Sequence, residues 1–444
     1  MLKHQPLIFA LLLTAMHWGC DDNNSDDGTD TEHNAPEESD SNGGYSDGDP
    51  EAGDAPTDSD EPMDSDIVAE EMFIADIEQA MSDDLVPGMA VAIVAGGEVA
   101  WQRGFGYGDL ESKEKITTDT PFPLASISKT FIGTTLMQLE ESGEIDIDDD
   151  INSFGLPFAV KHPGFEDERI TLRNLANHTS GILDDDEVYE CLYYIEADQS
   201  SLSNAFYPES CPEDMPTDLG TFLSAYLSED GALYADRNFT DAEDGRVGEV
   251  FNYSNIGAAL AAFAVETATG VRFETLCEEN IFAPLGMTNT HWHSEQFDDP
   301  SRITGLHVVI DEEPFRLPPY AYPTWPDGGL KASVADLARY FAAISAGGAL
   351  EGTRILSESK VREMLASQTD GIEVKGYSFD SYGIFWLGVQ GIVGHTGGDF
   401  GVTTAMLLEP NSGVGIVLLV NLDSESMNNF GLMIQKTFEF GMTF

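Results

Sequence analysis

The pattern of apolar and polar positions predicts a helix followed by a β-hairpin where regular patterning begins. Residues 67–81 have apolar side chains at helical spacing, and Pro87 follows the end of this pattern. The expected buried stripe of this helix consists of Ile67, Ile74, Ile77 and Met81. Two apolar runs, 89–94 and 99–105, flank Gly96-Gly97, which is typical of a hairpin turn.

A second hairpin is expected near the end of the chain. Apolar runs at 401–408 and 414–421 flank the turn-forming residues 410–413, and an amphipathic helix is predicted over 424–440. Residues 126 to about 300 are expected to be mostly helical, with polar insertions. Together these patterns predict an α+β fold, in which an antiparallel sheet from both chain ends has flanking helices and an inserted helical domain.

The first 19 residues have the pattern of a secretory signal. Lys3 precedes an apolar run at 6–16, which is too short to span a bilayer but fits the hydrophobic region of a signal peptide. Gly19 followed by Cys20 resembles the lipobox of bacterial lipoproteins, which implies a lipid on Cys20. The alternative is an ordinary cleaved signal with a free Cys20. We therefore expect an exported cell-envelope lipoprotein that faces the periplasm or the cell surface and contacts the membrane through this anchor.

Composition then divides the rest of the chain into a tether, 20–66, and a folded domain, 67–444. The tether holds 18 of the 80 Asp and Glu residues and no Lys or Arg, so it cannot bury much surface and should stay extended over about 35 Å or more. The whole chain has 20 Lys and Arg and a formal net charge of −60, which argues against nucleic acid as a partner.

Export also bears on the four cysteines. Cys191 and Cys211 bracket a polar stretch with loop character, and an oxidising compartment favours a disulfide between them. The alternative is that Cys191, Cys211 and Cys277 are free thiols.

Three Ser-x-x-Lys strings are candidates for a serine nucleophile beside a lysine. Ser112 and Ser357 lie in charged runs that are typical of solvated turns or helix ends, whereas Ser126 begins a largely apolar helix. Positions i and i+3 share a helix face, so Lys129 would lie one turn above Ser126. Burial there would favour the neutral amine, which can accept the proton of a hydroxyl, and amides at the helix start could stabilise an oxyanion.

Two further motifs accompany this one. Tyr253-Ser254-Asn255 is the only Tyr-x-Asn string in the sequence, and His395-Thr396-Gly397 lies beside the C-terminal hairpin. In this order, the three motifs resemble those of the serine β-lactamase and penicillin-binding-protein superfamily. The closest resemblance is to class C β-lactamase-like serine hydrolases, which include esterases, D-aminopeptidases and DD-peptidases. Supporting strings lie at 170–175, 178–181, 328–330 and 336–338.

The resemblance implies a role for each matching residue. Ser126 would be the acylated nucleophile, and either Lys129 or Tyr253 would be its base. Asn255 would orient Lys129 and the substrate. The backbone amides of Ser126 and Gly398 would form the oxyanion hole, and the substrate would lie against Thr396 and Gly397 on a strand where the glycines leave room.

His395 departs from the pattern, because the lactamases have Lys there. A neutral imidazole holds a substrate carboxylate less well than a permanent cation does, so His395 favours an esterase or D-peptidase over a β-lactamase. β-Lactams and peptidoglycan peptides remain the alternative substrates, and a binding lipoprotein without turnover is the alternative from another class. The acidic segment 184–250 is expected to form part of the cleft rim.

No metal or cofactor is expected. His291 and His293 with Glu295 have the composition of metal ligands, but the chain has no H-E-x-x-H and no convincing fourth ligand. His178 is expected to be a structural hydrogen-bonding residue. Aromatic side chains at Tyr320, Tyr322, Trp325 and Trp386 either line a cleft or pack in the core.

Overall fold

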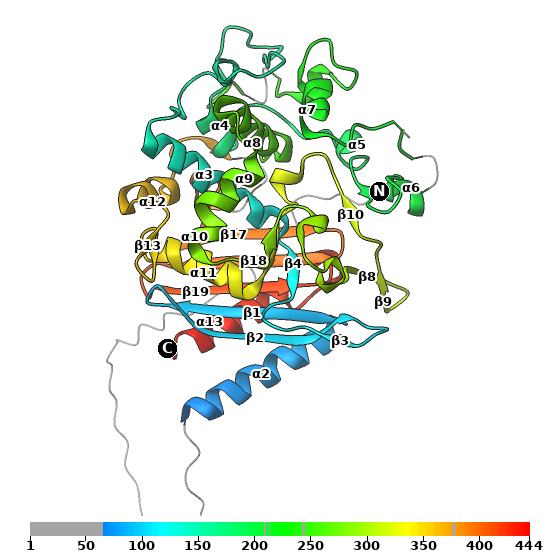
Figure 1. Cartoon of the computed structure of the whole chain (residues 1–444), viewed down its shortest axis with the longest axis vertical. Helices are drawn as coiled ribbons and strands as arrows, with labels where there is room; N and C mark the ends of the chain where they lie inside the picture. The colour runs from blue at the N-terminus through cyan, green and yellow to red at the C-terminus, as the bar shows by residue number, and fades with distance from the viewer. Residues whose placement is uncertain (1–64, 208–209, 213, 242–244, 375–376, 378) are drawn as a thin grey trace, which may run out of the picture.

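An eight-stranded antiparallel sheet lies at the centre of the protein (Figure 1). The computed structural model describes residues 65–444 except 208–209, 213, 242–244, 375–376 and 378, so the expected signal, Cys20 and nearly all of the tether lie outside the described residues. In spatial order the strands are β15 (Ser381–Tyr382), β16 (Leu387–Val389), β17 (Ile392–Asp399), β18 (Val402–Glu409), β19 (Val414–Val420), β1 (Gly88–Ala95), β2 (Glu98–Asp109) and β3 (Glu114–Lys115).

The two ends of the chain meet in the middle of this sheet. β1 pairs with β19 in the register Ala92↔Val417, and each strand also pairs with its hairpin partner. Successive side chains of β1 alternate between two cores: Ala90 and Ala92 face the helical side, whereas Met89 and Val91 face the terminal helices. The predicted α+β fold with a sheet from both chain ends is confirmed.

Helices cover both faces of the sheet (Figure 1). α2 (Ser65–Asp83) and α13 (Phe430–Gly441) pack on one face, and α11 (Val334–Ser345) packs on the other. The predicted stripe of α2 is partly wrong, because Ile67 is 52% exposed and Phe73 takes the core position, in contact with Trp101 and Phe440.

α13 begins later than the sequence predicts. Residues 424–426 form a short 3-10 turn, η8 (Ser424–Ser426), capped by Asp423. The buried carboxylate of Asp84 then accepts hydrogen bonds from the backbone N–H of Asn428 and Asn429, which holds this segment outside the helix. A long-range contact, rather than helical periodicity, therefore sets where α13 begins.

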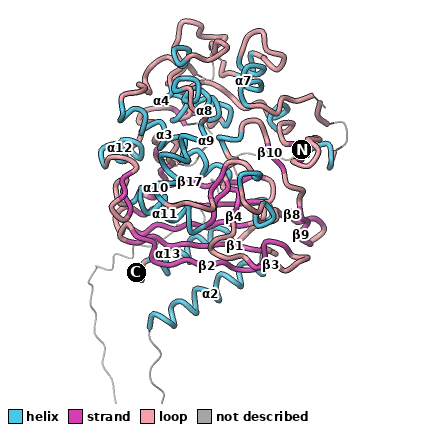
Figure 2. The backbone as a smooth tube through the Cα atoms, in the orientation of Figure 1, coloured by secondary structure: helices cyan, strands magenta, loops and turns pink. Residues whose placement is uncertain are grey.

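The inserted region consists of short helices and small sheets joined by loops, as Figure 2 shows in cyan, magenta and pink. Its central helix, α8 (Asn255–Thr269), is buried along most of its length. The other helices are α3 (Ser128–Ser142), α4 (Leu172–Ala176), α5 (Asp186–Tyr189), α6 (Leu202–Phe206), α7 (Leu219–Leu227), α9 (Phe273–Cys277), η4 (Glu278–Phe282), α10 (Ala283–Leu285) and α12 (Glu358–Leu365), with single turns at η1 (Ala125–Ile127), η2 (Ile151–Phe154), η3 (Asp236–Asn238), η5 (Ser294–Gln296), η6 (Pro300–Arg302) and η7 (Trp325–Asp327).

Small sheets account for the remaining strands. A three-stranded sheet joins β4 (Pro121–Pro123), β11 (Lys331–Ser333) and β7 (Thr290–His291), and the pairs are β5 (Tyr194–Ile195) with β10 (Tyr320–Ala321), β6 (Val250–Phe251) with β14 (Glu373–Val374), β8 (His307–Ile310) with β9 (Glu313–Arg316), and β12 (Ala349–Leu350) with β13 (Thr353–Arg354). Helix is therefore less continuous in the inserted region than the sequence predicts.

A disulfide joins Cys191 to Cys211 across 20 residues, with 5.4 Å between the Cα atoms, while Cys277 is a buried free thiol. Closing a loop of this length contributes about 3 kcal/mol in the chain-entropy account. Among the described residues, no single helix combines the length and apolar composition needed to cross a membrane, although the bent pair Asn255–Thr269 and Phe273–Leu285 meets both criteria when its members are joined.

Candidate active site

Ser126 lies in a short turn between a strand and a helix. β4 leads into η1, and α3 begins two residues after Ser126, so the serine precedes the helix that carries Lys129. Ala125 has φ +47°, a left-handed conformation that is uncommon for a residue with a side chain. Such strain is often found at functional sites, where the surrounding packing holds the backbone in place.

Lys129 is fully buried and contacts three oxygen atoms. Its Nζ lies 2.7 Å from Asn255 Oδ1, 2.7 Å from the backbone carbonyl oxygen of Asp327 and 3.2 Å from Ser126 Oγ. The first two atoms can only accept hydrogen bonds. A neutral amine at Lys129 would therefore donate both its N–H groups to them and direct its lone pair toward the hydroxyl of Ser126. This arrangement suits transfer of a proton from Ser126 to Lys129.

The second motif is placed by the start of α8. Ser254 caps this helix by accepting a hydrogen bond from the N–H of Gly257. The carboxylate of Asp184 accepts from Ser254 Oγ and from the N–H groups of Asn255 and Ile256. Burial raises the pKa of Asp184, and these three hydrogen bonds oppose that shift. Asn255 is thus held where its side chain reaches Lys129.

Tyr253 lies between the lysine and a histidine. Lys129 Nζ is 5.1 Å from the centroid of the Tyr253 ring, and the ring of His178 packs against the same tyrosine at 4.3 Å. Tyr253 is half-buried, like Ser126. The structure therefore brings Ser126, Lys129, Tyr253 and Asn255 into one cluster, although their segments are more than 120 residues apart.

The third motif lies on β17, beside the turn that holds Ser126. β16 pairs with β17 only as far as Gly394, so residues 395–399 have one edge without a neighbouring strand among the described residues. A Cβ at Gly397 would come within 2.5 Å of the Leu124 carbonyl oxygen and 3.0 Å of Ala125 Cβ. This glycine therefore permits β17 to pack on the nucleophile turn, a reason that differs from the expected space for substrate.

The remaining predicted residues of this motif lie next to Gly397. Gly398, with its predicted oxyanion amide, is opposite Thr403 of β18 and half-buried, and Thr396 is buried. The carbonyl oxygen of Thr396 is 2.6 Å from His395 Nδ1. The roles of the Ser126 and Gly398 amides in an oxyanion hole stay predictions.

His395 is buried and belongs to a hydrogen-bonded chain within the protein. Its Nε2 lies 3.0 Å from the hydroxyl of Tyr382, which in turn lies 3.1 Å from His178 Nε2. Burial and the nearby Lys129 lower the pKa of His395 to about 3, and burial is also the main reason that the pKa of His178 is lowered. His395 is therefore a neutral side chain whose two ring nitrogens both have protein partners.

Asp327 is a residue of the site that sequence reasoning missed. Its backbone carbonyl accepts from Lys129, its side chain is only 2% exposed, and its Oδ2 atom is buried without a hydrogen-bond partner in the part of the chain that the structure describes. Burial raises the pKa of Asp327 to about 7, against the opposing effect of Lys129. Asp184 and Tyr382 were also missed. No local motif marks these three residues, because each acts through partners distant in the sequence.

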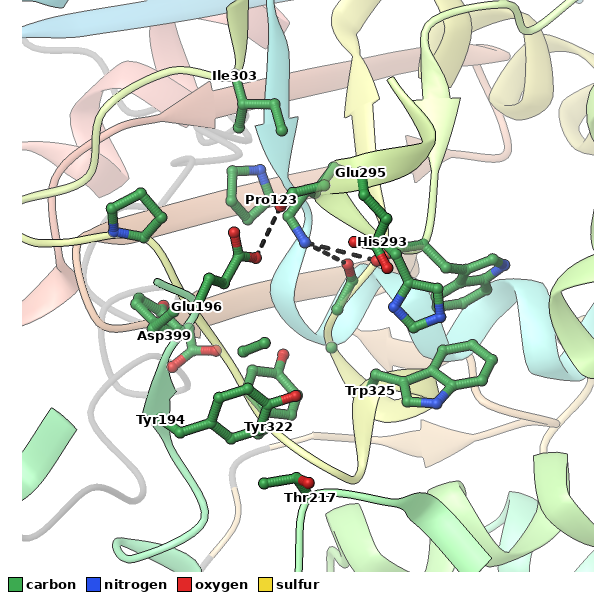
Figure 3. Close-up of a pocket in the computed structure, with 18 of the residues that line it drawn as sticks. Pro123, Tyr194, Glu196, Thr217, His293, Glu295, Ile303, Tyr322, Trp325 and Asp399 are labelled. Atoms are coloured by element: carbon green, nitrogen blue, oxygen red, sulfur yellow. Dashed lines mark hydrogen bonds between the residues drawn. The ribbon is translucent and has the colours of Figure 1, made fainter. Parts of the chain in front are cut away.

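A cavity of about 1550 Å³ lies beside this cluster. In Figure 3, Tyr194, Tyr322 and Trp325 line it together with the carboxylates of Glu196, Glu295 and Asp399. Pro123 and Gly328 also line it, and a Cβ at Gly328 would lie 3.6 Å from the carbonyl carbon of Ala125, so the cavity borders the nucleophile turn.

The other residues that the sequence singles out either line the cavity or lie away from the cluster. Ser357 caps α12, and Ser112 lies in an exposed turn whose N–H binds Asp109. Tyr320 lines the cavity together with Tyr322 and Trp325, whereas Trp386 is buried in the core. His293 also lines the cavity, packed against Trp325 at 5.0 Å. The segment that begins at Asp184 contributes to the cavity rim through Tyr194, Glu196 and neighbouring residues.

The geometry can be compared with known proteins. The chain is 22% identical over 370 residues to protein flp of Staphylococcus aureus (strain N315), a match that covers 79% of this chain and 62% of that protein. The chain thus spans less than two thirds of the length of this curated relative.

Solved structures show the same fold. The octameric penicillin-binding protein homologue from Pyrococcus abyssi has a TM-score of 0.68 at 23% identity, covering 84% of this chain and 77% of that chain. D-amino acid amidase from Ochrobactrum anthropi SV3 has a TM-score of 0.63 at 20% identity, covering 83% of this chain and 98% of that chain. The sequence also matches the Beta-lactamase family over residues 73–431, so the chain belongs to the beta-lactamase family.

Proposed function

We propose that this protein is an exported, membrane-tethered serine hydrolase that forms an acyl-enzyme on Ser126 and hydrolyses an ester or a D-amino-acid amide. The observation that carries this proposal is the environment of Lys129 Nζ, with two acceptor atoms at 2.7 Å and Ser126 Oγ at 3.2 Å. A nucleophile and a base within hydrogen-bond reach, with the base oriented by further groups, is the arrangement that serine acyl transfer requires.

In the proposed reaction, Ser126 Oγ attacks the substrate carbonyl carbon while Lys129 takes the hydroxyl proton. The tetrahedral oxyanion accepts hydrogen bonds from the backbone amides of Ser126 and Gly398. The bond to the leaving group then breaks, and the leaving group takes a proton through the Tyr253 phenol. Water repeats the sequence on the acyl-enzyme, which releases the acid and restores Ser126.

The third motif supports the choice of substrate class. Both ring nitrogens of His395 have protein partners, so this residue offers no cation to a substrate carboxylate. An ester or an amide without a carboxylate at this position needs no cation there. A β-lactam or a C-terminal D-alanyl peptide has such a carboxylate and would bind less well without the cation. One solved structure with this fold is a D-amino acid amidase, which supports the amide as one of the two substrate classes.

A second candidate function is that of a β-lactamase or DD-carboxypeptidase, and Lys331 favours it. This lysine lines the cavity, and among the described residues its Nζ donates hydrogen bonds to two backbone carbonyls, those of Gly329 at 3.3 Å and Trp292 at 3.5 Å. A substrate carboxylate that reached Lys331 would have a cation partner despite the neutral His395. Glu196 and Glu295 oppose such binding, because their charges act on the same ammonium.

The test compares wild type with Ser126→Ala on a short-chain p-nitrophenyl ester, a D-alanyl anilide and a chromogenic cephalosporin. We expect Ser126-dependent turnover of the ester or the anilide and little of the cephalosporin. A high Ser126-dependent rate on the cephalosporin would select the second candidate. If none of the three substrates showed Ser126-dependent turnover and a serine-reactive fluorophosphonate probe failed to label Ser126, the protein would be a binding lipoprotein instead.

The anchor is tested separately. We propose that Cys20 is lipidated and that residues 20–66 hold the domain away from the membrane. Mass spectrometry of the N-terminal peptide is expected to find a diacylglyceryl cysteine, and Cys20→Ser is expected to move the protein from the membrane fraction to the soluble fraction. An unmodified Cys20 in the mature protein would rule out the anchor while leaving the hydrolase proposal intact.

A further inference from the structure

Tyr382 connects the second and third motifs through two histidines. Its hydroxyl lies 3.1 Å from His178 Nε2 and 3.0 Å from His395 Nε2, and its side chain is fully buried. At the two ends of this chain, His178 Nδ1 lies 3.1 Å from the backbone nitrogen of Ser254, and His395 Nδ1 lies 2.6 Å from the backbone oxygen of Thr396.

The backbone groups at the ends determine the direction of every hydrogen bond between them. The N–H of Ser254 can only donate, so His178 Nδ1 accepts and the hydrogen of the neutral ring is on Nε2. His178 then donates to the oxygen of Tyr382, whose hydroxyl hydrogen is directed to His395 Nε2. His395 therefore has its hydrogen on Nδ1 and donates it to Thr396, whose carbonyl can only accept. Both ends lead to the same assignment.

An added proton would break this chain at either histidine. On His178 it would place an N–H at Nδ1, opposite the N–H of Ser254. On His395 it would place an N–H at Nε2, so that the Tyr382 oxygen would receive two donors and its own hydrogen would have no acceptor. The buried setting makes each unsatisfied group costly.

The charge of Lys129 also opposes protonation of the two histidines. Among the described residues, the titratable groups that contact or act on the two rings are Lys129 from α3, Tyr253 from the turn before α8 and Tyr382 from β15. Lys129 disfavours a second positive charge at both histidines. The buried acid Asp184 binds the same turn through Ser254 Oγ.

We propose that Tyr382 and His178 are positioning residues that keep His395 neutral, and that they thereby make the site select acyl donors without a carboxylate. This inference rests on the proposed hydrolase function for its kinetic consequence, but not for the tautomers that it requires. Neither residue is assigned contact with substrate. Each acts through His395, which has no free ring nitrogen while the chain is intact.

The tautomers can be measured directly on the wild-type protein labelled with 15N-histidine. Across pH 5.5 to 8 we expect His178 to have its hydrogen on Nε2 and His395 to have its hydrogen on Nδ1, with no titration of either ring. The two signals are assigned with His178→Asn and His395→Asn. Titration of His395 within this range, or the opposite tautomer on either ring, would overturn the inference, whatever the enzymatic activity.

The selectivity is measured with two esters that differ in one group, p-nitrophenyl butyrate and mono-p-nitrophenyl succinate. The ratio of their kcat/KM values cancels the pH dependence of the shared chemistry. In wild type this ratio is expected to be constant from pH 8 to 5.5. In Tyr382→Phe, which removes the hydroxyl between the rings, only burial and Lys129 still oppose a charge on His395, so the ratio should shift toward the succinate as the pH falls to 5.5.

A matched control separates this effect from the loss of a buried hydroxyl. Tyr340 is also fully buried, and its hydroxyl bonds Thr134 and the carbonyl of Thr130, so Tyr340→Phe removes a comparable group. We expect its ester ratio to match that of wild type. A constant, wild-type ratio in Tyr382→Phe with turnover of both esters would contradict the inference. Absence of Ser126-dependent turnover of either ester would instead count against the proposed function, and the tautomer measurement would still decide the inference.

Discussion

Two buried basic side chains belong to the candidate site, and their partners differ in kind. Lys129, between α3 and α8, faces two atoms that only accept and the hydroxyl of Ser126, so both its protonated and neutral forms satisfy every contact. His395, on β17, lies in a chain whose donors and acceptors are set at both ends. Burial alone therefore does not decide which group can exchange a proton; the hydrogen-bonding capacity of the partners does.

Removal of Lys129, the side chain that can exchange a proton with Ser126, should have the largest effect on catalysis. In Lys129→Ala, kcat/KM for the preferred ester is expected to fall by about 10³-fold, since general-base catalysis contributes about 10² to 10⁴. Stopped-flow measurement of the acylation rate checks this, and added methylamine should restore part of it. Ser126→Ala, the control, should show no such rescue. Acylation within tenfold of wild type would show that Lys129 is not the base.

Asp327, the acid beside Lys129, should make the free energy of unfolding depend on pH. The folded-state pKa of Asp327 is raised from 3.8 to about 7, so the folded protein holds a proton that the unfolded chain releases between these pH values. The free energy of unfolding therefore decreases as pH rises from about 4 to 7, by up to about 4 kcal/mol from this group. Asp327→Asn cannot ionise and should avoid this loss.

Urea denaturation of wild type and Asp327→Asn at pH 4 and pH 8 measures that difference. The variant is expected to be the more stable protein at pH 8, with the gap closing at pH 4, where Asp327 is largely neutral in the folded state. All other ionisable groups are shared, so they cancel in the comparison. A gap that is the same at both pH values would show that Asp327 is not held neutral in the folded protein.

The orientation of Lys129 should depend on Asn255. In Asn255→Leu the lysine loses one of its two acceptor-only partners, so its lone pair is no longer directed at Ser126 Oγ. We expect kcat to fall about 10- to 100-fold with little change in KM, because one buried N–H of Lys129 is left without an acceptor. Equal losses in kcat with Asn252→Leu, a neighbouring asparagine outside the cluster, would indicate general disruption of the turn before α8.

The smallest effect is expected on the histidine side. His395→Lys places a cation on β17, so the kcat/KM ratio for mono-p-nitrophenyl succinate over p-nitrophenyl butyrate should rise about tenfold at every pH tested. The same substitution leaves Lys129 and its three contacts in place, so turnover of the butyrate serves as its internal reference. No change in the ratio would mean that the substrate carboxylate does not reach β17.

Much of the fold was predictable because local patterns carry it. The two hairpins at β1–β2 and β18–β19 follow from alternating apolar runs around turn residues, and their pairing follows from the need to bury both apolar faces of each strand. Boundaries were less predictable where a distant group intervenes, as Asp84 does at the start of α13. Residue type also said little about Ile67 and Phe73, because the neighbours of α2 decide which of its side chains enter the core.

For the candidate site, sequence by itself determined the identities and order of the three motifs, and hence the family and the kind of nucleophile expected. Tertiary structure alone decided which hydrogen-bond partners surround those groups. The acceptor from Asp327 is a backbone carbonyl, which any residue could supply, and Tyr382 is effective only because it lies between histidines that are 217 residues apart in the chain. A local pattern records what a residue is, but the protonation state of a buried group depends on the donors and acceptors that folding brings to it.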